Sequence, residues 1–210
     1  MRKAGIILFL LLLGLSVLLY AQEEDSPEDE GPSIGAEWDD LYAPDLYIKG
    51  DQTFIMSIGT AFPAVFFNNG KVINHNLEPP VGGTGSLSYN YFFGARFFVG
   101  GEICGMFMPT LGVNTLFVIP LGVQAGYQFT LRRFEFPLTA GLGMVWHRYL
   151  DFGYYGFYMK GGAAAYFRFN SDWSFGLNAN WRWLPEWTKD PKENVDGNIV
   201  DLRLSVRYHF

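Results

Sequence analysis

From residue 51 onward, apolar and polar residues alternate along the chain with a period of two. In the last predicted strand, for example, Leu202 and Leu204 alternate with Asp201 and Arg203. Because successive side chains of a β-strand point to opposite faces, this pattern predicts strands with one apolar and one polar face. Eight such strands are predicted, over residues 51–62, 81–91, 94–107, 115–129, 134–147, 156–169, 173–184 and 199–210.

The connections between these strands alternate in length. Those after the second, fourth and sixth strands are tight turns, whereas the others are mostly longer, over residues 63–80, 108–114, 148–155 and 185–197. In the first long connection, Asn69-Gly70 is a hairpin signal that would extend the first two strands beyond the main sheet. Short turns at one end and long loops at the other, with an even number of strands, are typical of an up-and-down barrel of the bacterial outer-membrane type.

The aromatic residues indicate which face of this barrel is outside. A soluble lipid-binding barrel can also have eight strands, with its apolar face turned inward. Here, however, aromatic residues lie at both ends of the apolar face, as Tyr89 and Trp173 do near the tight turns and Phe62 and Trp181 near the long loops. Two such girdles fit two membrane interfaces. We therefore predict an all-β, eight-stranded antiparallel up-and-down transmembrane barrel in the bacterial outer membrane, with short periplasmic turns, longer extracellular loops and outer-membrane lipid against its apolar face.

Upstream of the barrel, the composition changes twice. Residues 1–21 have a basic start, an apolar run and a small residue before the expected cleavage point, which together predict an export signal peptide. Residues 22–49 are predicted to be an acidic, largely disordered periplasmic leader, because their many carboxylates and few apolar residues leave little to bury. The barrel domain is then predicted over 50–210, and its nearly balanced charge excludes nucleic acid as a partner.

The sequence contains no pattern typical of an enzyme or a cofactor site. Eight-stranded barrels that modify lipid A need a hydroxyl nucleophile, a His and a carboxylate together near the outer rim. Of the three histidines, His75 lies in a long connection, His147 lies near the outer rim without a serine beside it, and His209 lies at the opposite end. There is no zinc-ligand spacing, P-loop or dinucleotide fingerprint, and the single cysteine, Cys104, excludes an internal disulfide. We therefore expect a protein that is not an enzyme and that has no metal or cofactor.

Two stretches resemble known outer-membrane barrels. The closing run LRLSVRYHF is similar to the signal by which the outer-membrane assembly machinery recognises its barrels. The resemblance implies that this machinery is a partner during biogenesis and that the signal is carried by Leu202, Leu204, Val206, Tyr208 and Phe210.

The stretch IPLGVQAGYQFTLRRFEFPLTAGLGMVW resembles the fourth and fifth strands of the outer membrane protein W family, with matches at Pro120, Tyr127, Phe129, Phe136-Pro137 and Gly141-Leu142-Gly143. Small barrels of the A and X types share much of this pattern. The resemblance covers about residues 50–210 and implies a narrow channel for small, often hydrophobic solutes. The alternative is a structural or adhesive surface protein that presents extracellular loops, because side chains can fill the interior of an eight-stranded barrel.

Charged residues occur midway along several predicted strands, on the polar face. Counted from the tight turns, five of them lie at similar depth and are predicted to form a charge cluster in the middle of the lumen: Glu102, Lys160, Arg182, Asp201 and Arg203. One interpretation is that the five ions only satisfy one another in a packed interior. The other is a gate, in which pairs exchange partners and open a narrow path.

Overall fold

The computed structural model describes residues 47–68, 70–73, 81–109, 115–149, 152–186 and 194–210, all of which lie in one compact unit, Tyr42–Phe210. The predicted signal peptide, the leader up to residue 46 and His75 lie outside the described residues. The strands are β1 (Gln52–Asn68), β2 (Lys71–Ile73), β3 (Gly82–Phe92), β4 (Phe97–Pro109), β5 (Thr115–Leu131), β6 (Phe134–Tyr149), β7 (Phe152–Arg168), β8 (Trp173–Glu186) and β9 (Val195–His209).

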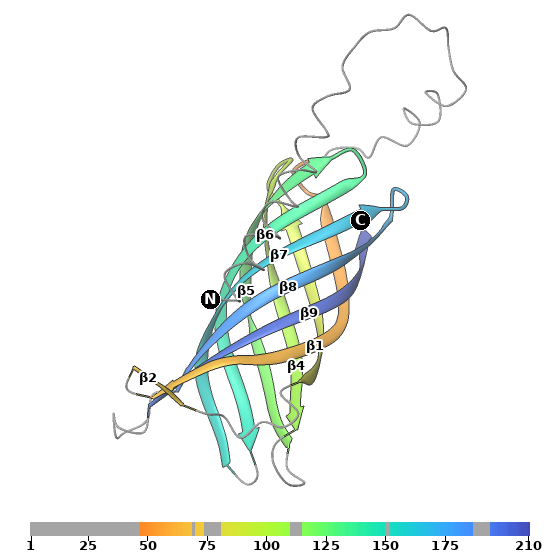
Figure 1. Ribbon diagram of the computed structural model, residues 1–210. Coiled ribbons are helices and arrows are strands. Elements are labelled where there is room, and N and C mark those ends of the chain that lie inside the picture. The colour runs from red at the N-terminus through yellow and green to blue at the C-terminus, as the bar shows by residue number, and fades with distance from the viewer. Residues whose placement is uncertain (1–46, 69, 74–80, 110–114, 150–151, 187–193) are drawn as a thin grey trace, which may run out of the picture. The chain divides into compact units, whose positions relative to one another are not determined.

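Eight of these strands close into an antiparallel barrel. Each main strand pairs with the next along the chain, and β1 also pairs with β9, from Thr53 opposite His209 to Asn68 opposite Val195. The tilted strands of this closed wall can be followed in Figure 1. Closure leaves the main sheet without a free edge, so its backbone groups are satisfied within the wall, as a membrane requires. The predicted all-β, up-and-down barrel is confirmed.

The strands extend further at the loop end of the barrel than the alternation predicts. The first strand continues to Asn68 through a bulge between Pro63 and Val65, and the Asn69-Gly70 signal is followed by the short strand β2, which pairs back onto β1. The long connection predicted over residues 148–155 is wrong, because β6 and β7 continue to pair up to Tyr149 opposite Phe152. The glycines and aromatic residues there look like a loop by composition, but they fit a strand pair.

The outer face of the barrel is apolar over most of its height. Side chains such as Ile58, Met144 and Leu204 are 72%, 67% and 66% exposed, which would be unfavourable in water. A row of this kind on every strand is suited to contact with lipid. Among the described residues, no helix is long and apolar enough to cross a membrane.

The inner face has three layers, which differ in chemistry. The layer at the loop end is apolar and contains the buried residues Ala61, Cys104, Met106, Met108, Val118, Val145, Tyr158, Leu184 and Ile199. The middle layer consists mainly of charged and amide side chains, and the layer at the tight-turn end combines aromatic and charged groups. The expectation of a polar lumen therefore holds for the middle and the tight-turn end only. Runs such as Met144-Val145-Trp146 are apolar on both faces, and period-two alternation cannot reveal the inward member.

Candidate functional site in the lumen

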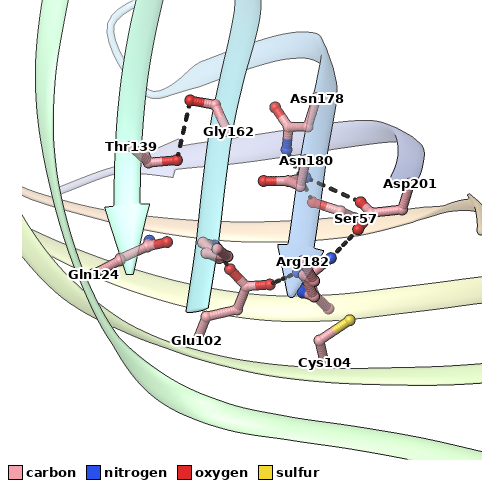
Figure 2. A network of polar contacts seen from close by, with 12 residues as sticks. Ser57, Glu102, Cys104, Gln124, Thr139, Gly162, Asn178, Asn180, Arg182 and Asp201 are labelled. Atoms are coloured by element: carbon pink, nitrogen blue, oxygen red, sulfur yellow. Dashed lines mark hydrogen bonds and ion pairs between the residues drawn. The ribbon is translucent and has the colours of Figure 1, made fainter. Parts of the chain in front are cut away.

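The five charged residues singled out from the sequence lie together in the middle layer. Glu102 of β4 forms ion pairs with Lys160 of β7, with Arg182 of β8 at 2.5 Å and with Arg203 of β9 at 3.4 Å. Asp201 of β9 pairs with Arg182 and, at 2.7 Å, with the Nε of Arg203. The two carboxylates thus bridge three bases that come from three strands, and Figure 2 shows Arg182 between Glu102 and Asp201.

Neutral side chains complete the coordination of this network. Asn180 donates a hydrogen bond to Asp201 Oδ1 at 3.0 Å, and Arg203 donates one to the hydroxyl of Ser86. The five charged side chains are buried, and Arg182 and Asp201 are fully inaccessible to solvent. Since an isolated buried charge costs several kcal/mol, as an order of magnitude, the mutual pairing is what makes this composition tolerable inside a membrane barrel.

A second group, which the sequence reasoning missed, closes the tight-turn end. Tyr47, just before β1, is 4% exposed, and its ring stacks on Phe92 with centroids 3.9 Å apart and an interplanar angle of 8°. Its hydroxyl donates a hydrogen bond to Glu135 Oε2 at 2.8 Å. Gly50 provides the sharp bend into β1 with a φ of +111°, and Phe98 packs next to Phe92. The segment before the barrel therefore covers its mouth.

Glu135 is the centre of a charged set in this mouth. Arg207 donates to its Oε2 at 2.6 Å, Gln128 donates to the same oxygen at 2.7 Å, and Arg168 lies 3.6 Å from Oε1. The guanidinium carbon of Arg207 also lies 3.7 Å from the ring centroid of Tyr166, a cation–π contact. Arg207 and Gln128 are not distinguished from their neighbours in the alternating sequence. Glu135 and Arg168, however, both lie on the inner face next to tight turns, and this position could have predicted a charged set at that end of the lumen.

The lumen is closed at each of its three layers. The apolar layer packs Met106, Met108 and Tyr158 across the loop end, the charge network fills the middle, and Tyr47 with its partners covers the tight-turn end. Between the network and the mouth lies a cavity of about 40 Å³, lined mainly by polar and charged side chains. The part of the lumen that the structure describes is therefore a packed interior that contains a small polar cavity, and it is closed in this conformation.

The two described histidines do not form a catalytic arrangement with their neighbours. At the outer rim, His147 Nε2 lies 2.9 Å from Glu186 Oε1 and its ring stacks on Tyr154. At the tight-turn end, His209 Nε2 lies 2.7 Å from Ser174 Oγ, but its Nδ1 faces Arg168 and Tyr47. A catalytic Ser–His pair needs a carboxylate on the second ring nitrogen to orient the ring and stabilise its charged form. An arginine at that position opposes the protonation that such a base requires.

Tyr47 gives a prediction about pH. Burial raises the pKa of the Tyr47 hydroxyl to about 12, above its ordinary value near 10. A group whose pKa is raised on folding stabilises the fold below its unfolded pKa and loses that contribution as the pH rises through its folded pKa. We expect Tyr47→Phe, which keeps the stack and loses the hydrogen bond, to cost about 1 kcal/mol at neutral pH. The difference between wild type and variant should shrink as the pH rises above about 10 and change sign before about pH 12, because the shift in pKa corresponds to more free energy than one hydrogen bond.

Urea unfolding in lipid vesicles at a series of pH values measures this difference. Tyr155→Phe is the matched control, because Tyr155 is 73% exposed and should show no such effect. A Tyr47→Phe variant that is as stable as the wild type at neutral pH would show that the Tyr47 hydroxyl does not help to close the mouth.

Comparisons with known proteins agree with this fold. A protein-family model matches residues 34–208 of the chain. An uncharacterized protein of Treponema pallidum (strain Nichols) is 28% identical over 213 residues, which are 95% of this chain and 94% of that protein. The crystal structure of Neisserial surface protein A has a TM-score of 0.58 at 9% identity and covers 77% of this chain and 97% of its own. The outer membrane protein OprG of Pseudomonas aeruginosa has a TM-score of 0.49 at 12% identity, with 78% and 97% covered.

At this identity, the similarity to the neisserial protein shows the fold alone. Together with the apolar outer face, that fold is the one expected of an integral β-barrel of the bacterial outer membrane.

Proposed function

We propose that this chain, which belongs to the family matched over residues 34–208, is a narrow, gated channel for small and preferentially apolar solutes, closed in the conformation described here. The resemblance to the outer membrane protein W family, seen in the stretch around Pro120 and Gly141-Leu142-Gly143, supports the same function. We propose no enzymatic activity, since the described histidines lack the partners that a catalytic base requires.

The observation that carries this proposal is the apolar layer at the loop end of the lumen. An interior that only conducts hydrated ions would be expected to be polar along its length. Here Met106, Met108, Val118, Leu184 and Ile199 face one another inside the wall instead. A small apolar solute that arrives from the loop side would find a favourable environment there, directly above the charge network. Flexible methionine side chains are suited to repacking around such a solute.

The charge network is the gate in this proposal. Arg182 and Arg203 each contact both Glu102 and Asp201, so either arginine that leaves one carboxylate still has the other within reach. Exchange of partners therefore does not require a bare charge in the membrane interior, which would be prohibitively costly. A change in pairing opens a path between the apolar layer and the polar cavity below it.

The single cysteine of the chain provides a direct test. Cys104 is 1% exposed and lies at the boundary between the apolar layer and the network, with its Sγ 3.8 Å from Arg203 Nη1. In a gated channel, a small methanethiosulfonate reagent should label Cys104 in the folded, membrane-inserted protein, and planar bilayers should show reproducible conductance steps. Uptake of small apolar solutes into liposomes should rise with the protein. Cys104→Ser is the control for labelling.

The second candidate is a closed surface barrel that presents its loops, and the closure of the lumen at three layers favours it. In that case bilayers should stay silent, liposome uptake should be unchanged, and Cys104 should react only after unfolding. This set of results would overturn the channel.

We also propose that the outward row of β9 carries the assembly signal. Leu202, Leu204, Val206 and Tyr208 alternate with the buried residues of this strand. Phe210, which directly follows the strand and is 65% exposed, donates a hydrogen bond from its N–H to the carbonyl of Gln52 in β1 at 3.0 Å. Deleting Phe210, or changing it to Ser, should remove most of the folded protein from the outer membrane while export continues. Cell fractionation with surface proteolysis measures this.

The matched control is Phe210→Tyr, which keeps an aromatic ring at the membrane interface and should be delivered normally. Normal levels of folded barrel in the Phe210→Ser variant would contradict a role of this residue in assembly.

A further inference from the structure

The buried charges of the lumen do not balance. Among the described residues, seven side chains of types that are ordinarily charged at neutral pH are less than a tenth exposed inside the barrel. Three of them are acids, Glu102, Glu135 and Asp201, and four are bases, Lys160, Arg182, Arg203 and Arg207. Among the residues that the structure describes, the buried interior therefore holds one base more than it holds carboxylates.

An unmatched charge is costly in this position. The lumen is closed toward both ends in this conformation, and the outer face of the wall is in contact with lipid, so bulk water screens the interior weakly. The excess charge can be removed in two ways: a base gives up its proton, or a counter-ion is bound. Because arginine hardly ever loses its proton, Lys160 is the one buried base among the described residues that could become neutral in this way.

The cavity between the network and the mouth lies where a counter-ion is needed. Its volume is about 40 Å³, and a water needs about 10–15 Å³ of such volume. Three of the four buried bases line it, Lys160, Arg203 and Arg207, but of the three buried acids only Glu102 does. The Nε of Arg207 is buried and has no hydrogen-bond acceptor among the described residues. The cavity thus has a net positive lining, an unused donor and space for a small ion.

The neutral lining also suits a small anion. Ser88, Gln124 and Asn180 contribute hydroxyl and amide groups to the cavity wall. Asn178 Nδ2 donates to the hydroxyls of Ser205 and Ser57, while its Oδ1 is buried and has no hydrogen-bond partner within the described part of the chain. Because hydroxyls can also donate, the amide can turn over and direct its NH₂ group into the cavity.

We propose that this cavity is a binding site for a small monovalent anion of the halide class, held between Lys160, Arg203 and Arg207. The site neutralises the excess charge of the lumen and joins the central network to the mouth. It does not depend on whether the barrel conducts, because its occupant is a fixed counter-ion of the closed state.

Bromide is the probe for the test. Crystals of the folded barrel grown in sodium bromide should show an anomalous scattering peak in the cavity next to Lys160 and Arg207. In detergent or vesicles at constant sodium concentration, chloride and bromide should raise the melting temperature relative to gluconate, which is too large for the cavity. At ten times the dissociation constant, the rise should be about 3–6 °C.

Two variants identify the site. Lys160→Met leaves three buried bases against three acids, so it should still fold and should lose the halide-dependent rise and the bromide peak. Lys71→Met removes the same charge from an exposed position in β2 and should keep both. If Lys160→Met fails to fold, the wild type still tests the site through the bromide peak and through the difference in melting temperature between halides and gluconate. The site would be contradicted by a wild type that melts at the same temperature in chloride and gluconate and shows no bromide in the cavity. That result would mean that Lys160 is uncharged and that no counter-ion is bound.

Discussion

We expect Glu102→Ala to destabilise the barrel by about 3–5 kcal/mol, because it leaves buried bases without their carboxylate. Glu102 is the partner of Lys160, Arg182 and Arg203 at once, and its side chain is 3% exposed. Asp201 can compensate for only part of this loss, since it already pairs with Arg182 and Arg203. Urea unfolding in lipid vesicles, or the loss of heat-resistant migration of the folded barrel, measures the effect.

Glu186→Ala is the matched control for this variant. Glu186 also pairs with a base, His147, but it lies at the rim and its side chain is 36% exposed, so its loss should cost no more than about 1 kcal/mol. In the double variant Glu102→Gln/Lys160→Met, the base is removed together with its acid. The double variant should therefore lose less stability than the two single variants lose in sum. Equal stability of Glu102→Ala and Glu186→Ala would show that the network contributes nothing to folding.

The same variant separates the two interpretations of the network. In the channel that we propose, Glu102→Ala leaves bases in excess at the gate, and the conductance should change and shift toward anions. If the folded fraction of the variant conducts no differently from the wild type, the network is structural only.

The position of this network could be predicted because depth in a barrel follows from counting. Strands run antiparallel between two ends, so residues counted from the tight turns reach similar depths on neighbouring strands. Counting placed Glu102 and Lys160 at one depth, and they form an ion pair. It could not assign the other pairs, because strand tilt and shear shift the register between strands that are not adjacent.

The mouth and the apolar layer could not be predicted in this way. Tyr47 lies at the end of a stretch rich in acids, before the alternating pattern begins, and only the closed barrel brings it next to Phe92 and Glu135. Met106 and Val118 look like any other apolar residues in a strand that is apolar on both faces. Period-two alternation identifies a wall with two different sides, and it is uninformative where the inside is also apolar.

The contrast between outside and inside gives the second large effect, which we expect at Leu204. This residue is 66% exposed midway along β9, whereas its neighbour Ser205 is 4% exposed and donates a hydrogen bond to Ser57 at 2.7 Å. Leu204→Arg should cost about 2–4 kcal/mol, the cost of an arginine facing lipid near the middle of a membrane barrel. It should therefore prevent most of the protein from inserting. Ser205→Thr keeps the hydroxyl and should insert normally.

These two substitutions distinguish a membrane barrel from a soluble one. The first places a charge on the outer face, and the second is a conservative change on the inner face. In a soluble barrel of this shape, Leu204 would point into water and an arginine there would be harmless or helpful. In the membrane, the arginine can reach neither headgroup from mid-strand without distorting the wall. Insertion into vesicles, followed by protease protection and the mobility of the unheated protein, distinguishes the two cases. Equal insertion of Leu204→Arg and Ser205→Thr would mean that the apolar face of β9 does not contact lipid.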